Sequence, residues 1–385
     1  MLKYLMFYED RGIEISYAEG QYVWDSNGKK YLDMHTGHGV AFLGHRHPHI
    51  VKSIVEQLNR VSILSTAFRH RVRDEMLDVL SKIVPNKFEY VYLLNSGSEA
   101  VDFSLKVARK VTGKKKIIYF TNSFHGRTFG ALSVTANSKY RKGFEPLLPE
   151  TYQLRYNDLS EVDKNIDDNT AAVIVELIQG EGGVNIATKE FVSILREKSV
   201  EKGAILVVDE IQTGFGRTGT IWLFEQYGIV PDILLAGKSM GGGFPVSAAF
   251  MSSDIASKLE AGCHGSTYGG NPIACAAIKA STEVLIGENV PQQAWIKGSK
   301  LISRLREDLE KYRIVKEVRG AGLMIGIDLR VEPTKIIKCL QDEGLLALKA
   351  GLTVLRLLPP YNISDEDIEF TVNRIGGCIS KQFSN

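Results

Sequence analysis

The stretch that decides the fold is AILVVDEIQTGFGRTGTIWLFEQYGIVPDILLAGKSMGGGFP (204–245). It contains two short apolar runs, AILVV and DILLA, and each runs into a loop rich in glycine. Short apolar runs without polar alternation are typical of strands that are buried on both faces. Similar runs occur at YVYLL (90–94), KIIYF (116–120), AAVIVE (171–176) and SAAFM (247–251). Helical patterns near 98–110 and 189–202 lie between them, so we predict an α/β fold with a mostly parallel sheet.

The sequence changes character on both sides of this region. Alternation around Asn27-Gly28 predicts a β-hairpin within 13–33, and helical periodicity follows in 52–64 and 73–84. After 274 we expect one long helix over about 272–312, then short strands at IVKEVRG, LMIGIDLR, LALKA and TVLRLLP, and a last helix from Ser364. We therefore predict an N-terminal segment (1–45) packed with a small domain (275–385), and a large domain (46–274) that binds the ligand.

Composition excludes several classes of protein. The 385 residues carry 47 Lys and Arg against 45 Asp and Glu, a net charge of +2 that disfavours a basic nucleic-acid binder. The run KVARKVTGKKK (106–116) is interpreted as a solvated helix end finished by Gly113. The four cysteines form no C-x-x-C pair, so we expect reduced thiols in a cytoplasmic enzyme. We expect no signal peptide and no membrane span.

Two charged residues end successive predicted strands. Asp209 follows AILVV and Lys238 follows DILLA, 29 residues later. Ligands bind at the carboxyl edge of such sheets, and burial there lowers the pKa of a lysine, so that part of it is a neutral, nucleophilic amine. The alternatives are a solvated strand end for Asp209 and an exposed loop lysine for Lys238.

A third feature lies upstream, in NSGSEA (95–100). Ser96 and Glu99 form an S-x-x-E capping box between a strand and a helix. This pattern fits an ordinary helix cap, and it also fits a phosphate held by the helix N-terminus. The Lys238 amine, the Asp209 carboxylate and the helix start at NSGSEA together match the needs of pyridoxal 5′-phosphate. This cofactor needs a lysine for its aldehyde, a carboxylate for its ring nitrogen and a site for its phosphate.

Six ordered motifs, NSGSEA, SFHGRT, VELIQGEGG, DEIQTGFGRTG, AGKSMGGGFP and GSTYGGNP, together resemble the class III aminotransferases of fold type I. The resemblance extends from YVWDSNGKKYLD to VLRLLPP. It departs at Leu177, where the family usually has proline, and at Ser98, where it usually has threonine. Two rival classes fit less well. A dehydrogenase would need a G-x-G-x-x-G turn that NSGSEA lacks, and a non-catalytic relative would lack the Lys238–Asp209 pair.

The resemblance implies roles for the residues that match these motifs. Lys238 is expected to be the catalytic, Schiff-base lysine, and Asp209 the partner of the ring nitrogen. The further expected cofactor-binding residues are Gly97, Ser98, Phe124, Glu210, Ile211, Gln212 and Thr267, with Thr267 reaching the cofactor of the other subunit in a homodimer with shared active sites.

The resemblance also implies substrate-binding residues. Arg127 is expected to bind the distal carboxylate of the substrate, because a guanidinium binds carboxylates bidentately. Ser266 is expected to lie close to the substrate. Arg356 is expected to bind the α-carboxylate of glutamate, with Glu181 pairing with Arg356 when an ω-amine enters instead. Both residues also fit ordinary structural roles, as a strand-edge arginine and a loop carboxylate.

Within the family, the sequence most resembles an archaeal branch that acts on aminoadipate or glutamate semialdehyde attached to an amino-carrier protein, in lysine and arginine biosynthesis. We therefore expect glutamate as amino donor and an acidic carrier protein as partner, with no nucleic acid and no membrane. The alternatives are acetylornithine aminotransferase, then ornithine or 4-aminobutyrate aminotransferase.

Four histidines crowd together in TGHGVAFLGHRHPH: His38, His45, His47 and His49. Histidine is a common metal ligand, but no neighbouring carboxylate or cysteine in the sequence completes a ligand set. We expect no metal site.

Overall fold

The computed structural model describes residues 2–383. Its centre is a seven-stranded sheet in the order β4-β12-β11-β10-β7-β5-β6. The strands are β4 (Tyr90–Leu94), β5 (Lys116–Phe120), β6 (Thr151–Leu154), β7 (Thr170–Val175), β10 (Ile205–Asp209), β11 (Ile233–Gly237) and β12 (Ser247–Met251). β12 runs antiparallel to both of its neighbours, and the other pairings are parallel. The predicted mostly parallel α/β sheet is confirmed. β6 was not predicted, because this edge strand is partly exposed and lacks a continuous apolar run.

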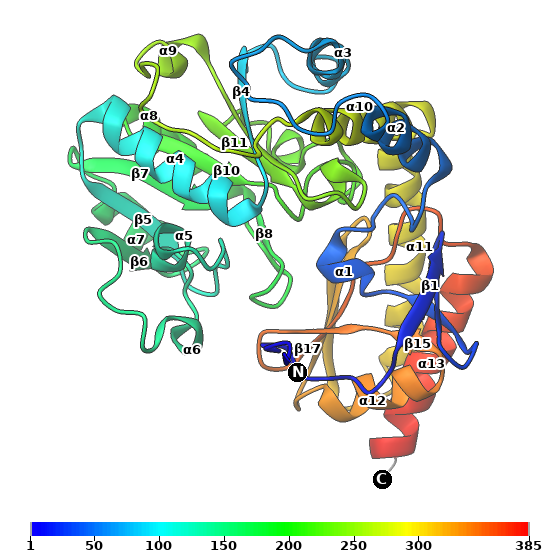
Figure 1. The fold of residues 1–385 in the computed structure, drawn as a ribbon. Helices are drawn as coiled ribbons and strands as arrows, with labels where there is room; N and C mark the ends of the chain where they lie inside the picture. Colours follow the sequence, from blue (N-terminus) through cyan, green and yellow to red (C-terminus); the bar gives the residue numbers. More distant parts are fainter. Residues whose placement is uncertain (1, 384–385) are drawn as a thin grey trace.

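Helices cover both faces of this sheet (Figure 1). Alternate residues of each strand point to opposite faces: Ile117 and Tyr119 pack with α4 (Gly97–Thr112), whereas Ile118 and Phe120 pack with α8 (Lys189–Glu201). Shorter elements surround them, namely α5 (Phe129–Ser133), α6 (Ser138–Arg141), α7 (Leu159–Asn165), α9 (Ser253–Ala256), η1 (Leu223–Tyr227), η2 (Lys238–Gly241) and the ribbon β8 (Ile178–Gln179) with β9 (Asn185–Ile186). The inner strands are therefore buried on both faces, which explains their apolar sequences, whereas the edge strands β4 and β6 are partly exposed.

The N-terminal and C-terminal parts of the chain share a sheet. This four-stranded sheet has the order β1-β2-β3-β15, from β1 (Ile15–Glu19), β2 (Tyr22–Asp25), β3 (Lys30–Asp33) and β15 (Leu345–Leu346). The C-terminal strand β15 pairs parallel with β3. A second C-terminal sheet has the order β13-β14-β17-β16, from β13 (Val315–Ala321), β14 (Met324–Leu329), β16 (Leu348–Ala350) and β17 (Val354–Leu357). Helices α12 (Thr334–Asp342) and α13 (Asp365–Phe383) flank these strands (Figure 1). The division of the chain into three domains stays a prediction.

The expected long helix over 272–312 is wrong, because the chain breaks at Glu288-Asn289. α10 (Pro272–Gly287) ends there and α11 (Val290–Leu309) begins, with Asn289 in the left-handed region at φ 49°. α10 packs against α2 (Pro48–Leu58) and α3 (Arg71–Leu80). α2 is also shorter than expected and ends at Leu58. No helix within residues 2–383 is long and apolar enough to cross a membrane.

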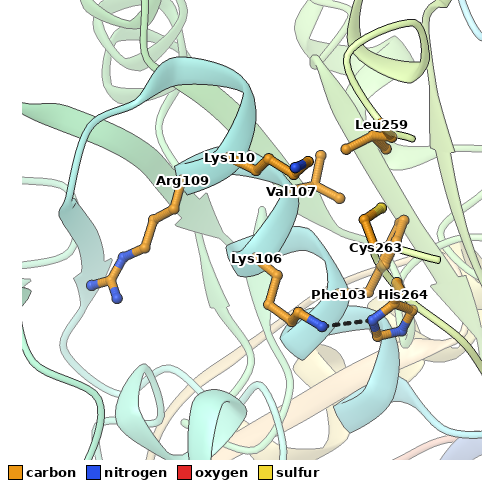
Figure 2. Close-up of a pocket in the computed structure, with 8 residues that line it drawn as sticks. All are labelled: Phe103, Lys106, Val107, Arg109, Lys110, Leu259, Cys263 and His264. Carbon is orange, nitrogen blue, oxygen red and sulfur yellow. Dashed lines mark hydrogen bonds between the residues drawn. The ribbon is translucent and has the colours of Figure 1, made fainter. Parts of the chain in front are cut away.

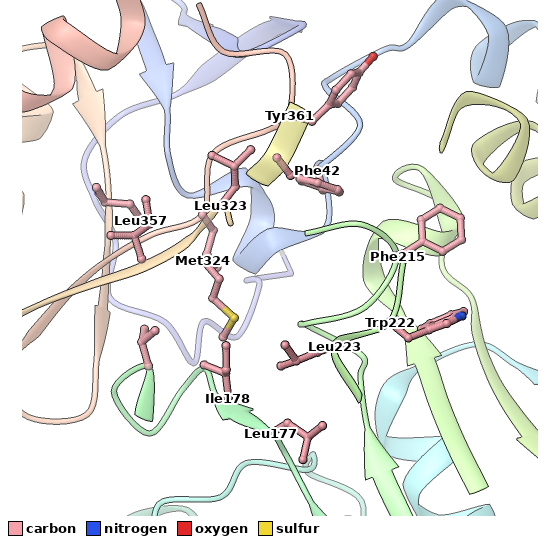
Figure 3. Close-up of a cluster of buried hydrophobic side chains, with 14 of the residues drawn as sticks. Phe42, Leu177, Ile178, Phe215, Trp222, Leu223, Leu323, Met324, Leu357 and Tyr361 are labelled. Carbon is pink, nitrogen blue, oxygen red and sulfur yellow. The ribbon is translucent and has the colours of Figure 1, made fainter. Parts of the chain in front are cut away.

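One apolar core joins the large sheet to the C-terminal part. Phe42 lies against Tyr361 and Met324 lies beside Ile178, and Phe215, Trp222 and Leu223 from the segment after β10 belong to the same cluster (Figure 3). All of these side chains are buried. The carboxyl edge of the sheet is thereby held in fixed relation to β17.

The cysteines differ from expectation. Cys339 of α12 and Cys378 of α13 form a disulfide, while Cys263 and Cys275 are free. The expectation of fully reduced thiols is therefore wrong. The pair lacks a C-x-x-C spacing because its residues lie 39 positions apart and meet only when the two helices pack. Disulfides also occur inside the cells of hyperthermophiles, so this bond does not fix a compartment.

Candidate active site

Asp209 and Lys238 lie at the carboxyl edge of the large sheet, as their strand positions predicted. β10 and β11 are parallel neighbours, with Asp209 in register with Leu235. Asp209 is the last residue of β10, and Lys238 follows Gly237 at the end of β11. Lys238 has φ 43°, a left-handed conformation that a non-glycine residue adopts only when its surroundings impose it. The amine is thus positioned by the backbone.

Burial favours the neutral form of Lys238. Burial, and next the positive charge of Arg356, lower the pKa of Lys238 to about 8, although Asp209, Glu181 and Glu176 act in the opposite direction. With this pKa a minor fraction of the amine is neutral near physiological pH, and the neutral form is the one that attacks a carbonyl group.

Asp209 is held by a histidine that the sequence analysis did not single out. His125 Nδ1 lies 2.7 Å from Asp209 Oδ2, and both residues are buried. Burial lowers the pKa of His125, but the hydrogen bond and charge of Asp209 outweigh it and raise that pKa. The backbone N–H of Ile211 donates to Asp209 Oδ1 at 3.1 Å. The only sequence signal for His125 is its place in SFHGRT, beside the expected Phe124 and Arg127.

Glu176, the first acidic residue of VELIQGEGG, is a second buried carboxyl group that sequence reasoning missed. It accepts a hydrogen bond from the backbone N–H of Phe124 at 2.9 Å. Burial raises the pKa of Glu176 to about 7. The charge of His125 acts to lower this pKa, and the charge of Asp209 acts to raise it. The site therefore contains a carboxyl group that titrates near neutral pH beside Asp209.

The start of α4 forms a cup of backbone donors. Ser96 Oγ caps the helix by accepting from the N–H of Glu99 at 3.3 Å, and the Glu99 carboxylate accepts from the N–H of Asn95 at 2.9 Å. The first N–H groups of a helix have no intrahelical partner, and those of Gly97 and Ser98 stand at this position. A Cβ on Gly97 would lie 2.8 Å from Ile211 Cδ1, so a side chain there would press on the Asp209 loop.

The loop that carries Phe124 and Arg127 packs onto this cup. Ser98 Oγ accepts from the N–H of Arg127 at 3.0 Å. The Arg127 guanidinium lies 3.5 Å from the centre of the Tyr140 ring and 5.5 Å from that of Phe124. Arg127 is exposed and forms no ion pair within residues 2–383 that would occupy it, so its guanidinium is available to a carboxylate.

Arg356 and Glu181, 175 residues apart, meet in an ion pair. Arg356 Nη2 lies 2.7 Å from Glu181 Oε2, and Arg356 Nη1 donates to Gln212 Oε1 at 3.3 Å. Arg356 is fully buried, and its Nε has no hydrogen-bond partner among residues 2–383. Arginine and glutamate side chains from β17 and from the loop after β8 therefore meet Gln212 of the β10 loop at one point.

Ser266 connects the GSTYGG segment to the N-terminus of α4 through a hydrogen bond with Asn95. Its Oγ accepts from Asn95 Nδ2 at 3.2 Å and from the N–H of Gly269 at 3.0 Å. Thr267 is exposed and Ser266 is partly buried. The segment thus lies beside the α4 N-terminus, with Thr267 on the surface.

Glu210 is the one expected cofactor-binding residue whose side chain is engaged elsewhere. Its carboxyl group accepts from the N–H groups of Leu223 and Phe224 at 2.7 and 2.8 Å and is buried at the start of η1. Burial raises its pKa to about 8. These contacts anchor η1 and leave no side-chain oxygen directed at Asp209 or Lys238.

A separate cavity of about 420 Å³ lies between α4 and the segment that carries Leu259, Cys263 and His264 (Figure 2). Phe103, Lys106, Lys110, Cys263 and His264 are among its lining residues, and Lys106 Nζ lies 2.9 Å from His264 Nδ1. None of the expected site residues lines it.

The clustered histidines pair with carboxylates from other parts of the chain. His45 contacts Asp33, His47 contacts Glu288 and His49 contacts Glu283. Within residues 2–383 His38 forms no such ion pair, and the charges of Glu181 and Arg356 act on it.

Comparison with known proteins fixes the family. The family model described as aminotransferase class-III matches residues 8–379. The chain belongs to the class III aminotransferases. A LysW-aminoadipate semialdehyde/glutamate semialdehyde transaminase of Sulfurisphaera tokodaii is 55% identical over 97% of this chain and 96% of its own length. An acetylornithine aminotransferase of Bacillus cereus is 40% identical over 95% and 94%.

Solved structures agree with this class III assignment. The ornithine aminotransferase of Toxoplasma gondii superposes with a TM-score of 0.94 at 32% identity, covering 98% of this chain and 93% of that one. The chain is therefore an aminotransferase of fold type I, and pyridoxal 5′-phosphate is its cofactor.

The residues present fit this cofactor. A lysine with a lowered pKa, a buried carboxylate and a helix N-terminus with open N–H groups lie at one sheet edge. Each matches one group of the cofactor: its aldehyde, its ring nitrogen and its phosphate.

Proposed function

We propose that this aminotransferase moves an amino group between glutamate and the terminal semialdehyde of an aminoadipate or glutamate attached to an amino-carrier protein, in lysine and arginine biosynthesis. The observation that carries the proposal is the 55% identity, over almost the whole chain, to a relative whose name states this substrate. A second relative with this name, from Sulfolobus acidocaldarius, is 54% identical over the same share of this chain.

When bound, the cofactor supplies an electron-withdrawing ring on which the amino group is carried between substrates. In our proposal Lys238 Nζ holds the cofactor and then moves the proton between the two reacting carbons. Asp209, kept in place by His125, holds a proton on the ring nitrogen. The N–H groups of Gly97 and Ser98 bind the phosphate, favoured by the dipole of α4.

Further cofactor contacts complete the proposal. Phe124 would cover one face of the cofactor ring and Gln212 would contact the ring oxygen, with Ile211, which packs against Gly97, also contributing to the cofactor site. Exposed Thr267 binds the phosphate of a second copy of this chain, so the active sites are shared across a homodimer. The exposure of Thr267 beside the α4 cup supports this assignment.

Substrate is oriented by two arginines. Arg127 binds the distal carboxylate of the carried substrate, with Ser266 beside it, and Arg356 binds the α-carboxylate of glutamate. Glu181 neutralises Arg356 when an ω-amine is bound instead, which lets one site accept two unlike amino donors. The 2.7 Å contact between Glu181 and Arg356 supports this switch.

The surface beside Arg127 suits an acidic carrier. Tyr140, which stacks on Arg127, is flanked by exposed Lys139 and by Lys142. A positive rim would favour an acidic partner and raise its association rate.

The proposal is tested by comparing kcat/KM for carrier-linked lysine with kcat/KM for free acetylornithine. We expect the carrier-linked substrate to be favoured, with an advantage that falls as salt rises. The double substitution Lys139→Glu/Lys142→Glu should remove that advantage without changing acetylornithine turnover. Equal use of both substrates would contradict the proposal.

That outcome would favour the second candidate, acetylornithine aminotransferase, which the 40% identity to the Bacillus cereus enzyme supports. Ornithine or 4-aminobutyrate activity would instead appear as turnover of those free amines.

A further inference from the structure

The turn α1 (Thr36–Gly39) is held in an unusual conformation. Thr36, Gly37 and His38 have φ values of 46°, 59° and 59°. The left-handed region is unfavourable for a β-branched residue such as Thr36 and uncommon for any residue but glycine. Consecutive residues of this kind persist only where the surroundings impose them, and they cluster at functional sites.

Two anchors fix this turn to the active site. Thr36 Oγ1 donates to the carbonyl oxygen of Leu358 at 2.6 Å, just beyond the strand that carries Arg356. The carbonyl oxygen of Gly39 accepts from Arg217 Nη2 at 2.7 Å and from Ser239 Oγ at 3.4 Å, and Ser239 follows Lys238. The turn therefore bridges the Arg356 strand and the Lys238 turn.

His38 is the titratable side chain of this turn. Its ring packs against His35, with centroids 4.6 Å apart, and against Tyr8 at 5.3 Å. The charges that act on it are those of Glu181, Arg356, Lys238 and Arg11. Burial lowers the pKa of His38, as do Arg356 and Lys238, while Glu181 raises it. Glu181 is the carboxylate whose charge acts most strongly on His38.

The Glu181–Arg356 pair poses a problem when glutamate binds. Arg356 can receive an α-carboxylate only if Glu181 turns away from it. The Glu181 backbone is held, because its carbonyl oxygen accepts from the N–H of Gly351 at 2.8 Å. Only its side chain can move, and a carboxylate left partly buried without a donor is unfavourable.

We propose that His38 is the positioning residue that receives Glu181, donating a ring N–H to its carboxylate when the Glu181–Arg356 pair opens to admit glutamate. A neutral imidazole has one N–H donor, so this contact does not require protonation of His38. The inference rests on the proposed function, since it concerns the glutamate half of the reaction. His38 acts through Glu181 and touches neither the transferred amino group nor the cofactor.

The test follows the two half-reactions of the holoenzyme separately, by the cofactor absorbance in a stopped-flow instrument. Glutamate is one donor and free acetylornithine the other. His38→Phe keeps an aromatic ring against His35 and Tyr8 but has no donor. We expect it to lower kcat/KM for glutamate about tenfold, the effect of a lost hydrogen bond to a charged group, and to leave the acetylornithine half-reaction within about twofold of wild type.

Two further variants separate this role from a merely structural one. His38→Asn keeps an N–H donor on a residue that tolerates the left-handed conformation, and it should restore most of the glutamate rate. In a Glu181→Gln background, His38→Phe should have no further effect on glutamate, because the carboxylate it serves is gone.

An equal loss in both half-reactions, or an unchanged glutamate rate in His38→Phe, would overturn the inference. So would a full effect of His38→Phe in the Glu181→Gln background. A wild-type enzyme that reacts with neither donor would instead refute the proposed function, so the two failures are distinguishable.

Discussion

Arg356 Nη2 and Glu181 Oε2 lie 2.7 Å apart, and the two side chains differ sharply in freedom. The Arg356 side chain is fully buried, whereas that of Glu181 keeps 29% of its surface exposed. The arginine also donates to Gln212. A fixed cation with a movable counter-ion can exchange that counter-ion for a substrate carboxylate, which is what a site for two unlike amino donors requires.

Glu181→Gln should shift the enzyme toward glutamate. Without the carboxylate, Arg356 is always available to an α-carboxylate and is left unneutralised when an ω-amine binds. We expect the ratio of kcat/KM for glutamate to that for acetylornithine to rise about tenfold, in line with loss of one charged hydrogen bond. Glu332→Gln, which changes a surface partner of Lys349, serves as the control. An unchanged ratio would show that the pair is structural.

Capture of the cofactor should depend on the protonation of Lys238. With its pKa lowered to about 8, the amine is protonated and unreactive below that pH and neutral above it. We expect the rate at which the apoenzyme binds added pyridoxal 5′-phosphate covalently to rise with pH and level off above about 8. Stopped-flow absorbance measures this rate. A midpoint near 10.5, the ordinary lysine value, would contradict the burial of the amine.

Asp209→Ala should destabilise the protein as well as inactivate it. It leaves His125 buried without its 2.7 Å partner, and removing one member of a buried charged pair costs about 3 kcal/mol of unfolding free energy. Asp209→Asn keeps an acceptor for His125, so it should cost less than half of that yet lower kcat about 100-fold, as expected when a preorganised charge is lost. Urea denaturation and steady-state kinetics check the two effects. Equal stability of both variants would argue against the His125 contact.

Reduction of Cys339–Cys378 should lower stability with little effect on activity. The bond closes a loop of 39 residues, for which the loop-entropy model gives about 4 kcal/mol. The loop contains β17 and Arg356, but Lys238 and Asp209 lie outside it. Tm with and without dithiothreitol measures the effect, and Cys339→Ser/Cys378→Ser is the matched variant. A double variant whose Tm equals that of the oxidised wild type would contradict this assignment.

The sequence predicted the sheet and its reactive edge because both follow from local patterns. Each apolar run became a strand, and the carboxyl ends of β10 and β11 brought Asp209 and Lys238 to one edge. The break at Asn289 escaped prediction because apolar periodicity continues across it, although Gly287, Asn289 and Pro291 are residue types typical of helix ends and starts.

Long-range contacts were less accessible. The partnership of His125 with Asp209 joins residues 84 positions apart, and the disulfide needs two helices to pack before its cysteines meet. Glu210 shows the opposite case: the family resemblance implied a cofactor-binding residue, but its carboxyl group accepts from the N–H groups of Leu223 and Phe224 and anchors η1.

The most direct test of the account is a single turnover carried out in two steps. Holoenzyme is first mixed with glutamate alone, and released 2-oxoglutarate is counted. After removal of free glutamate, the semialdehyde linked to its carrier protein is added. We predict one 2-oxoglutarate per active site, followed by one carrier-linked amine per site and return of the original cofactor absorbance. Release of no 2-oxoglutarate, or no amine formed on the carrier-linked aldehyde, would contradict the account.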